Sequence, residues 1–122
     1  MRTKREKDSA MNIRPIDEFY AVSPQITPDQ IAEIKAAGFK SIVCNRPDGE
    51  EPGQPAVAEI KKAAEDAGLY FAHVPVGGMG LTPDAVTGMV DALDDMEKPV
   101  LAYCRSGARS TRIYEEAKRL RG

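Results

Sequence analysis

The strongest constraint on the fold is a repeated change in the spacing of apolar residues along the chain. Short apolar runs, typical of buried strands, alternate with segments whose apolar residues recur every three or four positions, as in amphipathic helices. Such alternation implies right-handed crossovers between parallel strands. We therefore predict an α/β domain with a mainly parallel central sheet and helices on both faces. The predicted strands lie within residues 12–22, 39–44, 69–76 and 98–103, and the predicted helices within residues 27–37, 55–67, 82 onward and 108–121.

Length and composition narrow the possible roles of the chain. With 122 residues it is expected to form one domain over residues 11–122, preceded by a disordered leader over residues 1–10. The net charge is −2, with both signs mixed along the chain, which gives no reason to expect nucleic acid or a membrane surface as a partner. No signal peptide or long apolar run is present, so we expect a cytoplasmic protein. No other cysteine or histidine lies at metal-binding spacing from Cys44 or Cys104, so we expect no metal and no cofactor.

The most informative stretch follows the last predicted strand. Cys104 ends that strand, and a short glycine-containing loop leads directly into the last predicted helix. Free N–H groups at the start of a helix attract anions, and nearby arginines add positive charge, so the Cys104 thiol is expected to have a lowered pKa. The plainer alternative is that Cys104 is a small buried residue at the end of a strand. The expected anion-binding loop comprises Arg105, Ser106, Gly107 and Ala108.

Two other loops are expected at the same edge, because ligands of parallel sheets bind beyond the carboxyl ends of the strands. In the loop over residues 45–54, Asp48 and Glu50 are candidate proton donors, and Arg46 would add positive charge or pair with one of those carboxylates. The alternative is a polar surface loop held by its own salt bridges. The loop over residues 77–81 is rich in glycine and contains no acid or base.

The only histidine and the second cysteine are weaker candidates. His73 lies within a predicted strand, so we expect a structural histidine rather than a partner of the catalytic thiol. Cys44 ends its strand as Cys104 does, and if the two strands are adjacent their thiols would be close enough for a disulfide under mild oxidation. The alternative for Cys44 is a buried strand residue without reactivity.

The motifs together resemble a bacterial phosphatase-like domain family that occurs alone or fused to β-lactamase-like hydrolases and persulfide dioxygenases. The resemblance implies a dual-specificity-phosphatase-like fold, with Cys104 as nucleophile, Arg109 as the anion-binding arginine and Ser110 as a hydroxyl near the thiolate. The matching stretches are Ser23-Pro24-Gln25 with Thr27-Pro28, Asn45-Arg46-Pro47-Asp48-Gly49-Glu50, His73-Val74-Pro75-Val76, Leu81-Thr82-Pro83 and Tyr103-Cys104-Arg105-Ser106-Gly107-Ala108-Arg109-Ser110.

The sequence departs from the cysteine-phosphatase pattern at three places. Four residues separate Cys104 from Arg109, one fewer than in those enzymes, so the loop is more similar to that of rhodaneses. Tyr103 stands where cysteine phosphatases usually have histidine, and the loop expected to carry the general acid reads Gly77-Gly78-Met79-Gly80. The leading hypothesis is therefore sulfur transfer through a Cys104 persulfide, from a small anionic sulfane-sulfur donor to an acceptor thiol. The alternatives are a phosphatase that cleaves a phosphomonoester with Asp48 or Glu50 as acid, and a non-catalytic phosphate-binding module.

Overall fold

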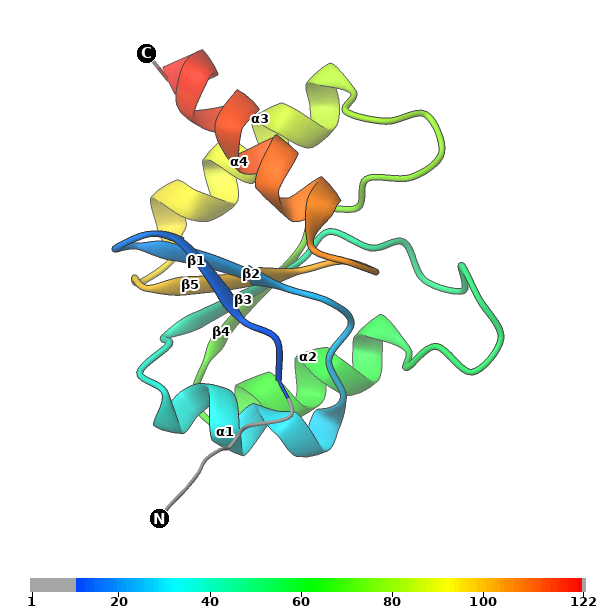
Figure 1. Cartoon of the computed structure of the whole chain (residues 1–122), viewed down its shortest axis with the longest axis vertical. Helices are drawn as coiled ribbons and strands as arrows, with labels where there is room; N and C mark the ends of the chain where they lie inside the picture. The colour runs from blue at the N-terminus through cyan, green and yellow to red at the C-terminus, as the bar shows by residue number, and fades with distance from the viewer. Residues whose placement is uncertain (1–10, 122) are drawn as a thin grey trace.

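A five-stranded sheet forms the centre of the domain in the computed structural model, which describes residues 11–121 (Figure 1). The predicted leader over residues 1–10 lies outside the described residues. The sheet has the order β1-β2-β5-β3-β4, in which β1 is antiparallel to β2 and all other neighbours are parallel. The strands are β1 (Arg14–Asp17), β2 (Tyr20–Ser23), β3 (Ser41–Cys44), β4 (Tyr70–His73) and β5 (Val100–Tyr103).

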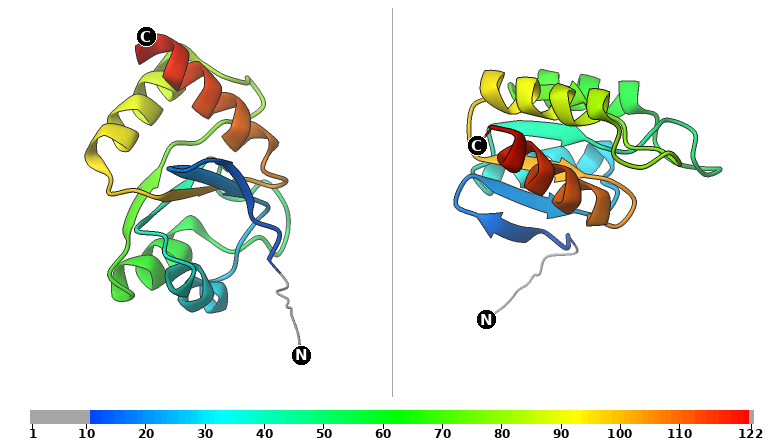
Figure 2. Two further views of the ribbon diagram at one scale, coloured as in Figure 1. Left: turned by 60° about the vertical axis from the view of Figure 1, so that its left-hand side comes forward. Right: turned by 90° about the horizontal axis from the view of Figure 1, so that it is seen from above.

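Two pairs of helices cover the two faces of this sheet (Figures 1 and 2). On one face lie α1 (Ile31–Ala36), which follows a 3₁₀ turn over Pro28–Gln30, and α2 (Val57–Asp66). On the other face lie α3 (Pro83–Asp95) and α4 (Ala108–Arg121), which pack against each other. The predicted fold class is therefore confirmed. Among the described residues, no helix has the length and apolar character needed to cross a membrane.

The central strand β5 is buried on both faces, which explains its uninterrupted apolar sequence. Its residues alternate between the two cores, because successive side chains of a strand point to opposite faces. Ala102 packs with α3 and α4, whereas Leu101 and Tyr103 pack with α1 and α2. Hydrogen bonds from β2 on one side and β3 on the other fix the position at which β5 ends.

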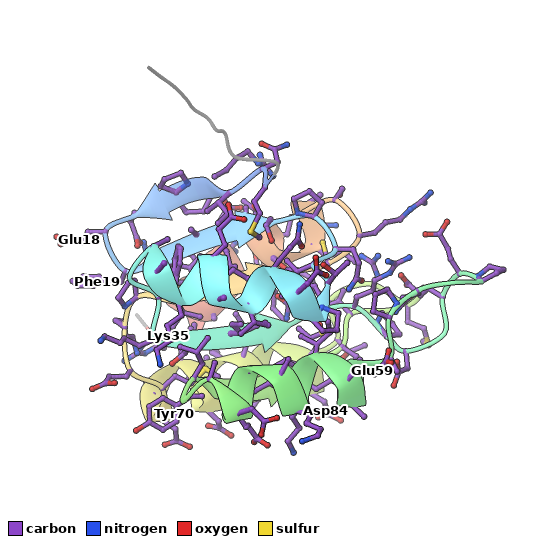
Figure 3. The ribbon with its side chains drawn as sticks, turned by 90° about the horizontal axis from the view of Figure 1, so that it is seen from below. Glu18, Phe19, Lys35, Glu59, Tyr70 and Asp84 are labelled. Atoms are coloured by element: carbon purple, nitrogen blue, oxygen red, sulfur yellow. The ribbon has the colours of Figure 1, made fainter. Side chains whose placement is uncertain are left out.

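The N-terminal part of the sheet, within residues 12–22, is predicted from the sequence as a short extended entry piece at the sheet edge followed by a first strand. It is a hairpin of β1 and β2, in which Asp17 Oδ1 accepts a hydrogen bond from Phe19 N at 2.9 Å. An aspartate that bonds to the backbone two residues later is a turn signal, and this signal separates the two strands. Glu18 and Phe19 at the turn lie at the end of the domain opposite the 45–54 loop (Figure 3).

The 3₁₀ turn before α1 and the helix α3 begin at the predicted threonine-proline pairs. The Thr27 backbone N–H donates to Gln30 Oε1 at 3.0 Å at the start of the 3₁₀ turn. Thr82 precedes Pro83, and its Oγ1 accepts a hydrogen bond from Ala85 N at 3.1 Å. This second contact satisfies a donor that has no partner inside α3 and fixes where the 77–81 loop ends.

Replacing Thr82 tests how much this cap stabilises the fold. Thr82→Ala is expected to lower the free energy of unfolding by about 1 kcal/mol, because the Ala85 N–H loses its acceptor. Thr87→Ala, at an exposed position inside the same helix, is the matched control and should change stability little. Urea unfolding followed by circular dichroism measures both, and equal effects of the two substitutions would contradict the capping role.

Candidate functional site

The carboxyl ends of β2, β3 and β5 meet at one end of the sheet, as predicted for parallel strands. The chain continues from them into Gln25, the 45–54 loop and the 104–110 loop, and the 77–81 loop lies at the same end (Figure 2). Backbone hydrogen bonds join these segments: Gln25 N donates to Arg105 O at 3.4 Å, and Asn45 N donates to Tyr103 O at 2.8 Å.

Cys104 lies at the base of the loop that leads into α4, with no exposed surface. Gly107 N donates to Cys104 Sγ at 3.0 Å. Burial raises the pKa of the Cys104 thiol, but hydrogen bonds from the backbone N–H groups of the loop and the first turn of α4 outweigh it, so the pKa lies below its ordinary value. The principal lowering contributions come from the backbone of Ser106, Gly107, Arg109 and Ser110. The thiolate is thus stabilised mainly by backbone amides, whereas the sequence had also suggested Arg105.

Gly107 is required by this loop for two reasons. Its φ of +98° lies in the left-handed region that side-chain-bearing residues rarely adopt. A Cβ at this position would also lie 2.9 Å from Arg14 Nη2 and 3.5 Å from Ser23 O. The loop can therefore turn its amides toward the sulfur only with glycine at residue 107.

Ser110 lies fully buried in the first turn of α4, next to the loop. Its backbone carbonyl accepts a hydrogen bond from the Tyr20 hydroxyl at 2.8 Å, which connects α4 to β2. Within residues 11–121 its Oγ has no hydrogen-bond partner. A buried hydroxyl normally finds a partner, so Ser110 retains hydrogen-bonding capacity beside the cysteine loop.

The guanidinium group of Arg109 joins the start of α4 to the 45–54 loop and to Val76, the residue before the 77–81 loop. It contacts both carboxylate oxygens of Glu50, at 2.7 and 2.9 Å, and donates to Val76 O at 2.7 Å. Glu50 and the Cys104 sulfur both raise the pKa of Arg109, so the guanidinium is a fixed cation beside Cys104. The bidentate geometry also restricts how this cation is oriented.

Arg46 extends the ion-pair network of Arg109, because both guanidinium groups pair with Glu50. Its side chain is only 3% exposed and contacts Glu50 at 2.8 Å and Glu51 at 2.6 Å. Gln25 Oε1 accepts a third hydrogen bond from Arg46, at 3.0 Å. Glu51 also lies 3.3 Å from Arg105, whose side chain is 67% exposed. Arg105 therefore extends toward solvent rather than over the sulfur.

The two carboxylates considered as proton donors have structural partners. Glu50 is held by Arg109 and Arg46, and the hydrogen bond from Arg109 is the largest cause of the lowering of its pKa to about 2. Asp48 Oδ1 accepts a hydrogen bond from Val57 N at 2.9 Å, at the start of α2. Neither carboxyl is arranged to donate a proton in this conformation, because Glu50 is ionised and Asp48 caps a helix.

Cys44 and His73 lie beside the site without taking part in the cysteine loop. The strands β3 and β5 are neighbours, but Cys44 lies opposite Tyr103 rather than Cys104. Its thiol donates to Arg46 O at 3.3 Å, and burial raises its pKa. His73 ends β4 instead of lying inside it, and its Nε2 contacts the same carbonyl oxygen at 2.9 Å. Both residues thus hold the beginning of the 45–54 loop.

Comparison with known proteins identifies the family. Residues 12–120 match the family described as "Beta-lactamase hydrolase-like protein, phosphatase-like domain". The chain belongs to this family. A beta-lactamase hydrolase-like protein from Agrobacterium fabrum is 36% identical over 107 residues, which cover 88% of this chain and 25% of the relative. The chain thus spans about a quarter of the length of the curated relatives it matches.

Solved structures place this phosphatase-like domain among proteins of the same fold. A proposed phosphatase from Neisseria meningitidis has 40% sequence identity and a TM-score of 0.75, with 84% of this chain and 72% of that chain covered. Tk-PTP in its active form has 19% identity and a TM-score of 0.60, with 89% and 82% covered. The second comparison shows the fold alone. The resemblance inferred from the sequence motifs is confirmed by the family and by these structures.

Sequence reasoning missed two residues of the site in the phosphatase-like domain. Gln25 was noted only as part of a motif, although it follows a parallel strand and therefore had to reach the same edge. Glu51 was not singled out, yet it joins Arg46 to Arg105. The position of Gln25 was a usable signal, whereas the sequence contained no signal that distinguished Glu51 from its neighbour Glu50.

The lowered pKa of Cys104 predicts selective alkylation. At pH 6 iodoacetamide should modify Cys104 at least about tenfold faster than Cys44, because only the first thiol is stabilised as a thiolate. Arg109→Ala should slow the reaction of Cys104 by removing the neighbouring cation. Peptide mass mapping between pH 5 and pH 9 measures both cysteines in one sample, with Cys44 as the internal control. A profile for Cys104 centred near the ordinary value of about 8.5 would contradict the thiolate.

The ion pairs of Glu50 predict a pH-dependent contribution to stability. Glu50→Gln should lower the free energy of unfolding at pH 7 by about 1–3 kcal/mol, because two guanidinium groups lose a charged acceptor. The pKa of Glu50 is lowered from 4.5 to about 2, so its stabilisation is fully present above pH 4.5 and is lost as the pH falls through 2. Urea unfolding at pH 7, 4 and 2 should therefore show a difference between the two proteins that shrinks toward pH 2. Glu65→Gln, at an exposed position of α2, is the control, and a Glu50→Gln effect that is equal at pH 7 and pH 2 would refute the assignment.

Proposed function

We propose that this phosphatase-like domain is a thiolate-based sulfurtransferase, in which Cys104 takes a sulfane sulfur from an anionic donor and passes it to an acceptor thiol. The observation that carries the proposal is the state of Glu50. With its pKa lowered to about 2 by Arg109 and Arg46, this carboxylate has no proton to give near neutral pH. Sulfur transfer suits such a site, because sulfite and thiolates leave without protonation.

The chemistry balances without a metal or an external oxidant. The Cys104 thiolate attacks the outer sulfur of a donor such as thiosulfate, a new S–S bond forms, and the old S–S bond breaks with its electron pair on the departing sulfite. The product is a Cys104 persulfide anion. An acceptor thiolate then attacks the outer sulfur of that persulfide, takes it away and regenerates the Cys104 thiolate.

The residues of the loop have separate roles in this proposal. The backbone amides that stabilise the thiolate would also stabilise the persulfide anion, which carries its charge beyond Sγ. Arg109 supplies the fixed cation for the anionic donor. The buried Ser110 Oγ has no partner among residues 11–121. It would donate a hydrogen bond to Cys104 Sγ when the acceptor removes the outer sulfur and leaves the Cys104 thiolate. The loop between Cys104 and Arg109 is one residue shorter than in cysteine phosphatases, which suits the transfer of a single sulfur atom.

The second candidate is a cysteine-dependent phosphatase, and the comparisons favour it. The family is described as phosphatase-like, and the Neisseria meningitidis protein is a proposed phosphatase. The same thiolate and Arg109 would attack and bind a phosphomonoester. This reaction requires a proton for the departing alkoxide, which an acid typically supplies with a gain of about 10²–10⁴-fold. Glu50 would have to leave both arginines, or Asp48 would have to leave Val57 N, before either acted as that acid. A third class, a phosphate-binding module without turnover, uses only the loop.

Mass spectrometry of the intact protein decides between these functions. After incubation with thiosulfate the protein should gain about 32 Da, the mass of one sulfur atom on the nucleophile. The added mass should disappear with cyanide or a thiol, and it should not form in Cys104→Ser. An aryl phosphate should be cleaved slowly, because its phenolate leaves without help, and an alkyl phosphate should not be cleaved.

Two other outcomes would overturn the proposal. Cleavage of alkyl or protein phosphates without any persulfide, abolished by Asp48→Asn or Glu50→Gln, would establish the phosphatase. Binding of phosphate or sulfate at the Cys104 loop with neither activity would establish the non-catalytic module. Cys44→Ser is the control variant, because Cys44 lies outside the cysteine loop and should leave persulfide formation unchanged.

A further inference from the structure

The two edges of the central sheet differ in how well they are protected. At one edge, β1 contains Pro15, which lacks a backbone N–H, and its register shifts between Pro15 and Asp17. A proline and an irregular register both hinder the addition of another strand. At the other edge, β4 has a regular register and contains no proline and no lysine, since its sequence is Tyr70-Phe71-Ala72-His73. The β4 edge is therefore open to a further strand.

The backbone of β4 presents hydrogen-bonding groups on its free side. The N–H groups of Tyr70 and Val74 donate to carbonyl oxygens of the 40–44 segment at 3.1 and 2.9 Å, so both face β3. Alternate residues of a strand direct their backbone groups to opposite sides, so those of Phe71 and His73 point away from β3. Within the described part of the chain, no other strand pairs with β4. Tyr70 is 54% exposed and His73 is also exposed, which shows that solvent reaches this edge.

A groove of about 460 Å³ lies beside this edge, between β4 and α3. Small residues form part of its wall, namely Ala72 of β4 and Ala85, Gly88 and Ala92 of α3. They leave room for the side chains of a strand that pairs with β4. Tyr70, two residues before Ala72, is on the same face of the strand and extends this surface toward the amino end of β4.

Aspartates of α3 form the outer rim of the groove. Asp84 lines it, and Asp91 and Asp95, which are exposed, follow at helical spacing on the same side of α3. None of these aspartates forms an ion pair with another described residue, and the described residues that line the groove include no lysine or arginine. Figure 3 shows Asp84 and Tyr70 on the same side of the domain. The uncompensated negative charge of this rim favours a basic occupant.

We propose that the β4 edge and this groove bind an extended, basic segment of a partner protein, which adds to the sheet as an additional strand. Backbone hydrogen bonds to Phe71 and His73 would supply affinity, and every second side chain of the segment would point into the groove. There, apolar side chains contact the alanines, and lysine or arginine side chains reach the aspartates along their apolar stems. The inference is independent of the proposed function, because no residue of the 104–110 loop takes part.

Two acetylated and amidated heptapeptides test this binding, KTVTRTV and its reverse VTRTVTK, since an added strand can run in either direction. In an extended peptide, valine and the basic residues share one face and threonine occupies the other. At least one of the peptides should bind the wild-type protein in an NMR titration. Its binding should slow the hydrogen exchange of the Phe71 and His73 amides, which a contact through charge alone would not do.

N-methylation of every second residue of the peptide tests the backbone contacts. The modification is made in both frames, so that the methyl groups point toward β4 in one peptide and away from it in the other. The first should bind at least about tenfold more weakly than the second, because its N–H groups can no longer donate to β4. The two peptides have the same side chains and the same charge, so each is the control for the other.

Charge reversal tests the rim of the groove. Asp91→Lys should weaken binding of the basic peptide by about fivefold, because an attractive contact becomes repulsive. The same variant should strengthen binding of the corresponding peptide in which glutamate replaces both basic residues. Glu115→Lys, at an exposed position of α4 that does not line the groove, is the control. At physiological ionic strength it should change the binding of neither peptide.

Three outcomes would overturn the proposal. The first is absence of binding by both basic peptides. The second is equal binding of the two N-methylated forms, which would show a contact through side chains alone. The third is slow exchange of the Phe71 and His73 amides in the free protein together with a dimer in analytical ultracentrifugation, which would show that a second copy of the chain occupies the edge.

Discussion

The structure depends on a set of backbone N–H groups that converge on one buried sulfur atom. Burial alone would raise the pKa of the Cys104 thiol, and the backbone amides of the loop and the start of α4 lower it below its ordinary value. They can do so only because β5 delivers the sulfur to the first turn of the helix, with Gly107 in a left-handed conformation between them. The flanking strands β2 and β3 hold β5 on both edges, so the position of Cys104 is set by the core of the fold.

Around this sulfur, acidic residues control where the positive charge lies. Glu50 orients Arg109 beside the loop and also competes with any anion that would bind there. Arg46 holds Glu50 from behind and is almost fully buried, so the carboxylate has two cationic partners rather than one. An incoming anion therefore meets a guanidinium that is already ordered, at the cost of displacing or sharing Glu50. Through these contacts, Glu50 connects the 45–54 loop to the start of α4.

The sequence predicted the fold well because its signals are local. Apolar periodicity located every strand region and helix, and the Thr82-Pro83 pair located the start of α3. The hairpin turn after Asp17 was not predicted, because it depends on the hydrogen bond from Phe19 N to the Asp17 side chain. The cysteine loop could also be predicted, since Cys104 and Arg109 are close in the chain.

The partners of Glu50 could not be predicted from the sequence, because its contact with Arg109 joins two loops that only the tertiary fold brings together. Asp48 illustrates the same limit: its role at the start of α2 depends on the path of the 45–54 loop.

The strand order also determines when this domain can assemble during its synthesis. In the order β1-β2-β5-β3-β4 the strands β2 and β3 have no hydrogen bonds to each other, and β5 joins them although it is the last strand in the chain. Without residues 100–103 the chain has no strand that joins the β1-β2 hairpin to the β3-β4 pair. The long sequence separation makes that closing step slow and cooperative. The segment that completes the sheet is the one that carries Cys104 at its end, so the cysteine loop can reach its final position only when the sheet closes.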